Sequence, residues 1–385
     1  MPYWRLSGFY LFFFASLGAL IPYWGLYLKS LGFGAQDIGI FMAIIMATKI
    51  ISPNIWGYIA DRTGRRMAIV RLGSLLALIS FSCVLIAQTF WWLVFVMVAF
   101  SFFWNAALPQ FEATTFNHLG SDSHHYSSIR LWGSVGFIIA VVLLGPLLDD
   151  KGASILPYFL IVLFAGIWLS SLIAPDSEYI PHSVEDVHLW VLLKKPTIIA
   201  LLFVCLFMQM SHEAYYTFYT IYLSESGYSN SVIGQLWALG VIAEVVVFLF
   251  MHKLVPKFGL LFLLQISLAL TTVRWLLIGF FVQDIFILVA AQILHAASFG
   301  VYHAAAIHLI HRYFTGRNQG IGQALYSSLS FGAGGAIGSY ISDMTWEELG
   351  PSLTFLIASV IAMVGLIIAR IWLNTSESNM PPDQV

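Results

Sequence analysis

The sequence predicts an all-α integral membrane protein, with twelve transmembrane helices arranged as two pseudo-symmetric six-helix bundles. Three observations predict this class: the composition, the number of long apolar segments and an internal repeat. Hydrophobic residues make up 59% of the 385 residues and charged residues only 9%, whereas a soluble domain carries about 25% charged residues. We therefore expect the chain to lie in a lipid bilayer. The net charge of −2 gives no reason to expect a nucleic-acid partner.

Twelve segments are long and apolar enough to cross a bilayer, which takes about 20 residues per helix. They lie near 5–28, 38–60, 67–87, 90–116, 128–148, 154–174, 197–223, 231–251, 259–280, 285–310, 320–342 and 351–373. The first is too long for a cleavable signal peptide. The connection between the sixth and seventh spans is long and charged. We predict an N-terminal bundle over residues 1–174, a linker over 175–196, a C-terminal bundle over 197–373 and a disordered cytoplasmic tail over 374–385.

The lysines and arginines orient the spans. With the N-terminus in the cytoplasm, twelve of them fall on the cytoplasmic side and two, Lys29 and Lys151, on the opposite side. Because positive residues concentrate in cytoplasmic loops, we expect both termini in the cytoplasm. The remaining three fall within or at the mouth of apolar spans: Lys49, Arg130 and Arg274.

An internal repeat relates the two halves. Residues 27–44 and 222–239 are similar at a constant shift of 195 residues, which also places Lys49 opposite Glu244. The matches include Tyr27 with Tyr222, Gly32 with Gly227 and Gly39 with Gly234. Duplicated six-span units that enter the membrane from the same side are typical of one large transporter class, whose substrate site lies near the bilayer midplane.

Several ionisable residues fall inside the spans, where a charge costs about 2.5–3.5 kcal/mol on insertion scales and is a functional-site hypothesis by default. The set is Lys49, Glu112, Arg130, Glu213, Glu244 and Arg274, with His212, His295 and His303 beside them. Helical periodicity places His212, Glu213 and Tyr216 on one stripe, and Gln292, His295 and Phe299 on another. Each charge has an alternative. Lys49 and Glu244 could form a structural ion pair or pair locally, and Arg274 could simply hold a neighbouring carboxylate.

No catalytic motif appears, so we do not expect an enzyme, and the histidines lack the carboxylates or cysteines that a metal site would need. We expect no cofactor. Without an ATP-binding motif, uphill transport has to use an ion gradient. A buried carboxylate is suited to carry a proton, because burial favours its neutral form and an approaching cation or water favours its charged form.

The turn after the second span carries a more specific motif. Gly57, Asp61, Arg62, Gly64, Arg65 and Arg66 match the pattern G-x-x-x-D-R-x-G-R-R, which resembles the signature of the major facilitator superfamily. A positive cytoplasmic loop would explain the arginines but not the glycines and the aspartate. The resemblance implies the major facilitator fold, with the glycine allowing close helix approach.

Five further segments resemble the phenylpropionate permease group of that superfamily: 130–137, 214–216, 236–245, 273–275 and 292–295. This resemblance covers nearly the whole chain. It implies a monomeric secondary active transporter of the bacterial inner membrane, which takes up a small organic solute by proton symport. The best candidate solute is an aromatic carboxylate such as 3-phenylpropionate. Three alternatives remain open: a proton-coupled sugar or nucleoside symporter, a proton-driven exporter, and a membrane sensor that does not transport.

A wider resemblance, to lactose permease-type proton symporters, implies roles for individual residues. It places Glu112 and Arg130 facing substrate, and Glu244, Arg274 and His295 in proton coupling. Ser298 stands where the sugar symporters carry a carboxylate, which favours Glu244, and then Glu213, as the proton carrier. The predicted substrate-binding residues are Arg130, Glu112, Lys49, Trp132, Tyr216, His212, Gln292 and Phe299, with Arg130 or Lys49 as the partner of an anion and the aromatic residues as contacts for a ring.

Overall fold

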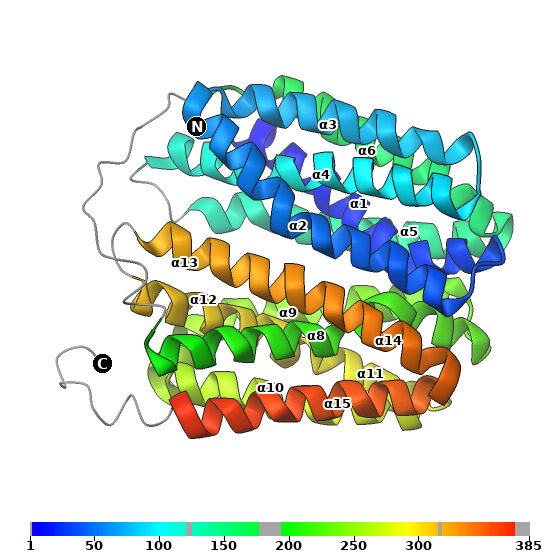
Figure 1. Ribbon diagram of the computed structural model, residues 1–385, viewed down its shortest axis with the longest axis vertical. Coiled ribbons are helices and arrows are strands. Elements are labelled where there is room, and N and C mark those ends of the chain that lie inside the picture. Colours follow the sequence, from blue (N-terminus) through cyan, green and yellow to red (C-terminus); the bar gives the residue numbers. More distant parts are fainter. Residues whose placement is uncertain (1, 121–124, 177–193, 315–317, 374–385) are drawn as a thin grey trace. The chain divides into compact units, whose positions relative to one another are not determined.

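The computed structural model describes residues 2–120, 125–176, 194–314 and 318–373. Within these ranges all regular secondary structure is helical (Figure 1), which confirms the predicted all-α class. Residues 177–193 of the predicted linker and the predicted tail lie outside the described residues.

The first half forms six long helices joined by short turns. They are α1 (Tyr3–Ser30), α2 (Ala35–Thr63), α3 (Arg66–Ser82) with the short 3-10 helix η1 (Cys83–Leu85), α4 (Phe90–Leu119), α5 (Tyr126–Lys151), and α6 (Leu156–Ile173) preceded by η3 (Ala153–Ile155).

The second half differs in that three of its helical runs contain π-helical turns. Its elements are α8 (Pro196–Glu225), α9 (Asn230–Phe258), α10 (Leu260–Phe280), α11 (Ile285–Ile293) with the π-helix η4 (Ala296–Val301) and α12 (Tyr302–Tyr313), α13 (Asn318–Ser327) with the π-helix η5 (Ser328–Gly334) and α14 (Gly335–Leu349), and α15 (Pro351–Ile368) with the π-helix η6 (Ala369–Leu373).

Eleven helical runs in the described part of the chain are long and apolar enough to cross a membrane. The predicted span at 320–342 is helical too but is not among the eleven, because it contains six glycines and five serines. Small residues let helix backbones approach closely in a membrane. At Gly338 an added Cβ atom would lie 2.4 Å from the carbonyl oxygen of Met210. The low hydropathy of this span reflects the small residues that let it pack closely against α8.

The repeat predicted from the sequence reappears in the backbone. Gly32 and Gly227, 195 residues apart, have φ angles of 90° and 91° in the turns after α1 and α8. Gly64 and Gly259, also 195 residues apart, follow α2 and α9 with φ angles of 66° and 76°. Left-handed backbone favours glycine, so each glycine ends a helix at the corresponding point of its half.

The chain divides into two compact units. Among the described residues, unit 1 contains α1 to α6 together with residues 216–238, which are the end of α8, the following turn and the start of α9. Unit 2 contains the rest of α8 and α9 and all of α10 to α15.

In unit 1, α1 packs on α5 and α6, and α4 packs on α2 and α3. Two glycines bring α1 and α5 together: a Cβ atom at Gly136 would lie 2.1 Å from the carbonyl oxygen of Leu11, and one at Gly18 would lie 2.8 Å from that of Phe137. In unit 2, α10 is central and contacts α15, η4 and α12. The first polar cluster described below lies around α10 and the junction of α11 with η4.

Candidate transport site

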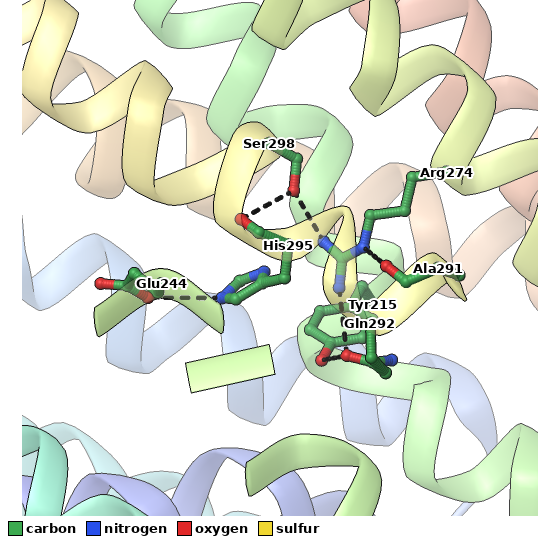
Figure 2. Close-up of polar contacts among 7 residues, drawn as sticks. All are labelled: Tyr215, Glu244, Arg274, Ala291, Gln292, His295 and Ser298. Atoms are coloured by element: carbon green, nitrogen blue, oxygen red, sulfur yellow. Dashed lines mark hydrogen bonds and ion pairs between the residues drawn. The ribbon is translucent and has the colours of Figure 1, made fainter. Parts of the chain in front are cut away.

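A buried arginine holds the junction between α11 and the π-helix η4 (Figure 2). Arg274 on α10 has no solvent-exposed surface. Its Nε donates to the carbonyl oxygen of Ala291 at 2.9 Å, and its Nη1 donates to Ser298 Oγ at 3.0 Å. A longer bond of 3.5 Å joins its Nη2 to Gln292 Oε1. These three acceptors are uncharged, and Arg274 ties the three residues together.

The local fold explains why the carbonyl oxygen of Ala291 is available to accept a hydrogen bond. Carbonyl groups in the last turn of an α-helix lack intrahelical partners, and Ala291 lies in the last turn of α11. The π-helix that follows is a rare turn, frequent at functional sites. Aromatic rings complete the surroundings of the cation, since the guanidinium carbon of Arg274 lies 4.3 Å from the ring centroid of Tyr215 and 4.7 Å from that of Trp275.

Gln292 has a defined orientation in this network. Its Oε1 accepts a hydrogen bond from Tyr215 at 2.9 Å as well as the bond from Arg274. Two donors at one atom identify that atom as the amide oxygen. The other amide atom, Nε2, is buried and has no hydrogen-bond partner among the described residues. A donor of Gln292 therefore points away from Arg274.

Glu244 and His295 form the acid–base pair of the site. His295 Nε2 lies 3.6 Å from Glu244 Oε2, and the two side chains are 8% and 17% exposed. The other ring nitrogen of His295, Nδ1, is buried without a hydrogen-bond partner in the described part of the chain. The ring stacks on Phe299, with 5.6 Å between centroids, and Phe299 stacks in turn on His303. Figure 2 shows Glu244 and Arg274 on opposite sides of His295.

The seventh-span carboxylate is held separately in unit 2. Glu213 is fully buried and accepts hydrogen bonds from Gln209 at 2.9 Å and from Ser339 on α14 at 3.1 Å. His212, its neighbour, has Nδ1 2.8 Å from the carbonyl oxygen of Met208. The His212 ring meets Trp275 edge to face at 4.9 Å. Glu213 therefore links α8 to α14.

In unit 1, the fourth-span carboxylate and the fifth-span arginine share a polar cluster. Tyr126 donates to Glu112 at 3.1 Å. The Arg130 guanidinium lies 3.6 Å from the ring centroid of Phe14 and interacts electrostatically with Glu112. The structure thus brings together the two residues that the sequence placed on the substrate-facing side of the first half.

Three further predicted residues make other contacts. Lys49 is half-buried, with Nζ 3.5 Å from the sulfur of Met46. Trp132 donates to the hydroxyl of Tyr3 at 3.0 Å. Tyr216, in unit 1, stacks parallel to Trp237 at 6.4 Å. Lys49 and Glu244 belong to different units, and their pairing stays a prediction.

The glycine- and arginine-containing motif forms the turn between α2 and α3. Asp61 accepts a hydrogen bond from Arg66 at 3.0 Å, and Arg62 donates to the hydroxyl of Tyr58 at 2.9 Å. Gly64 ends α2 in left-handed backbone, and Arg65 is the N-cap residue that precedes α3. At Gly57, an added Cβ atom would come within 3.6 Å of the Gln110 side chain. The motif therefore shapes one tight, charged turn.

Sequence reasoning missed several partners of these residues. Tyr126, Phe14 and Ser339 contact Glu112, Arg130 and Glu213 from other helices, and Gly240 lies against Gln292 and His295. Periodicity within one helix says nothing about which helix lies opposite. The abundance of glycine and serine near Ser339 was the one available signal, since it indicates close packing.

Residues 3–357 match the family described as the MFS_1 like family. The chain is 30% identical over 371 residues to the Escherichia coli (strain K12) protein named "Probable 3-phenylpropionic acid transporter", a match that covers 93% of this chain and 94% of that protein. It is 23% identical over 367 residues to the maltose permease of Geobacillus stearothermophilus, covering 94% and 92% of the two chains.

The crystal structure of the nucleoside transporter NupG has the same fold, with a TM-score of 0.82 at 17% identity over 97% of this chain and 99% of that one. The predicted superfamily and fold are thereby confirmed, as is the prediction that the chain is not an enzyme. The chain belongs to the MFS_1 like family and is a membrane transporter of the major facilitator superfamily.

Proposed function

We propose that the protein is a secondary active transporter that takes up a small organic anion together with protons, by alternating access. The best candidate substrate is an aromatic carboxylate such as 3-phenylpropionate. The proposed setting is the bacterial inner membrane, with both termini in the cytoplasm and the protein acting as a monomer.

The observation that carries proton coupling is the pair formed by half-buried Glu244 and buried His295, 3.6 Å apart, beside the buried cation of Arg274. Ionisable groups in apolar spans are costly and are retained for function. A carboxylate and an imidazole in contact share a proton readily, and their affinity for it depends on nearby charge and on water access. A conformational change that alters either factor moves the proton.

Two observations support an aromatic anion as the substrate. Arg130 in unit 1 and Arg274 in unit 2 are guanidinium groups placed on aromatic rings, and guanidinium groups bind carboxylates strongly. The relative that is 30% identical is named for a carboxylic acid with a phenyl ring. The sequence-based assignment of Arg130 or Lys49 as the partner of the anion stays a prediction.

The test is a proton-uptake assay with the purified protein in liposomes that contain a pH-sensitive dye. The protein is offered 3-phenylpropionate, maltose and uridine in turn. We expect proton influx with the aromatic acid alone, above the rate in protein-free liposomes, which corrects for the neutral acid that crosses lipid unaided. Influx with maltose or uridine would instead identify a sugar or nucleoside symporter. Net efflux from inverted vesicles would identify an exporter, and binding without flux a sensor.

A further inference from the structure

We propose that Asp343, near the end of α14, takes up protons at the non-cytoplasmic end of unit 2 and passes them to Glu213 through Ser339. The inference rests on the proposed function, because it assumes that protons cross with the substrate and that the N-terminus lies in the cytoplasm. It adds a route by which a proton enters, along a helix that contributes nothing to the pair of Glu244 and His295.

Asp343 is a buried acid that the polar clusters described above do not use. It lies directly after the predicted span at 320–342, is 2% exposed, and has its Oδ1 buried without a hydrogen-bond partner among the described residues. A buried oxygen that lacks a partner is costly, and more so when it is charged. Binding a proton removes the charge, so Asp343 is suited to take up a proton from the surface and hold it.

The buried face of α14 consists of small and polar residues. Its members are Gly335, Gly338, Ser339, Ser342 and Asp343. This face packs on α8 at Glu213, since a Cβ atom at Gly338 would lie 2.8 Å from Glu213 Cγ, and Ser339 donates to Glu213 Oε2 at 3.1 Å. Along this face, no apolar side chain of α14 separates Asp343 from the residues that contact Glu213.

Helical geometry places Asp343 one turn after Ser339. Residues four apart in an α-helix lie on the same face, with about 5–6 Å between their Cβ atoms. Helical side chains lean towards the N-terminus and cover the preceding turn, which brings the carboxyl group of Asp343 towards Ser339. A single water molecule between the two side chains completes a hydrogen-bonded row that ends at Glu213.

The row reaches the surface at Glu347. This residue follows Asp343 by four positions, is exposed, and interacts electrostatically with it. A carboxylate at the surface attracts cations, and its side chain leans back over the turn that holds Asp343. Glu348 is exposed as well, but it follows Ser339 by nine positions and therefore lies on the opposite side of the helix.

Protons are conserved at each transfer along the row. Protonated Asp343 gives its proton through water to Ser339 Oγ, while Ser339 gives its own hydroxyl proton to ionised Glu213. Serine is suited to this step because its hydroxyl group both donates and accepts. Asp343 is left ionised and ready for the next proton. Glu213 adjoins His212, which interacts electrostatically with His295, so the row leads towards the acid–base pair.

The test measures the influx of protons that 3-phenylpropionate drives into liposomes, with the full-length protein and an enclosed pH-sensitive dye. Asp343→Asn keeps the size of the side chain but cannot bind a proton, so the maximal rate should fall at least about tenfold. The half-saturating concentration of the acid should change less than about twofold, because Asp343 does not contact the substrate. Asp343→Glu restores a carboxyl group and should recover most of the rate, which a purely structural role would not allow.

The neighbouring glutamates provide a matched pair of variants. Glu347→Gln removes the surface carboxylate of the row and should slow influx, whereas Glu348→Gln should leave it unchanged. Equal rates in these two variants would contradict the row along α14. Influx that Asp343→Asn leaves unchanged, or that Asp343→Glu fails to recover, would overturn this inference alone. Absence of influx in the unaltered protein would overturn the proposed function together with it.

Discussion

At the scale of single residues, the second half of the transporter uses charged groups and neutral hydrogen-bonding groups together. Arg274 is fully buried, and its hydrogen bonds to Ala291, Ser298 and Gln292 go to uncharged acceptors. Glu213 is held by Gln209 and Ser339 in the same way. These bonds orient each charged side chain within unit 2.

Glu244→Gln tests the proposed proton carrier at this scale. The amide keeps the size of the side chain and cannot bind and release a proton. We therefore expect accumulation of 3-phenylpropionate to be abolished, while exchange of labelled for unlabelled substrate across the membrane persists, since exchange does not require the carrier to lose its proton. Both rates are measured in proteoliposomes.

Glu348→Gln is the control for this substitution, because Glu348 is an exposed carboxylate at the end of α14. It should accumulate substrate normally. Normal accumulation by Glu244→Gln would show that another group, with Glu213 as the next candidate, carries the proton.

At the scale of helices, the structure is held at points where a backbone needs a partner from another element. Asp149, at the end of α5, accepts hydrogen bonds from the backbone nitrogens of Asn230 and Ser231 at 2.8 and 2.9 Å and from both of their side chains. The first N–H groups of a helix have no intrahelical acceptor, and a negative charge there is favourable. Lys29 and Glu225 form an ion pair in the same unit.

Asp149→Ala tests this cap. Removing the carboxylate leaves the first turn of α9 without its acceptor, which should lower the free energy of unfolding by about 1 kcal/mol. Hydrogen exchange at Asn230 and Ser231 should become faster. Asp150→Ala is the control, since Asp150 is an exposed carboxylate paired only with the adjacent Lys151 in the ion pairs described. Equal exchange in the two variants would contradict the cap.

Gly136→Ala tests the contact between α1 and α5. Its Cβ atom would lie 2.1 Å from the carbonyl oxygen of Leu11, so the two helices have to separate, at a cost of about 1–3 kcal/mol. We expect a lower midpoint of thermal unfolding in detergent. Gly8→Ala, also on α1, meets no atom within 4 Å and should leave the midpoint unchanged or higher. If Gly136→Ala and Gly8→Ala unfold at the same midpoint, α1 and α5 do not pack as closely at Gly136 as the structure has them.

At the scale of the whole molecule, one structural plan is repeated. The glycine pairs Gly32 and Gly227, and Gly64 and Gly259, end corresponding helices 195 residues apart with similar φ angles. Parallel repeats of this kind are the plan of the major facilitator fold. Each half also has its own ionisable residues inside the spans, with half-buried Glu112 and Arg130 in unit 1 and half-buried Glu244 with buried Arg274 and His295 in unit 2.

The predicted orientation can be tested on intact cells with a maleimide that does not cross membranes. In a chain with Cys83 replaced by serine, a cysteine is introduced at Thr89, between η1 and α4, or at Thr63, at the end of α2; both positions are exposed. Positive residues place the turn at Thr63 in the cytoplasm. Labelling of Thr89→Cys alone is therefore expected before the cells are broken, and of both afterwards. Labelling of Thr63→Cys alone in intact cells would show that the chain has the opposite orientation.

The amino-acid sequence by itself determined the class, the approximate positions of the helices, the 195-residue repeat and the short set of charges inside apolar spans. These follow from composition and spacing along the chain, because burying a charge or ending a helix has a cost that is visible locally. Only the tertiary structure decided the partner of each buried group, such as Ser298 for Arg274 or Ser339 for Glu213. The partners come from other helices, at 3.0 and 3.1 Å. The packing that brings them together depends on small residues across the contact rather than on any pattern within one helix.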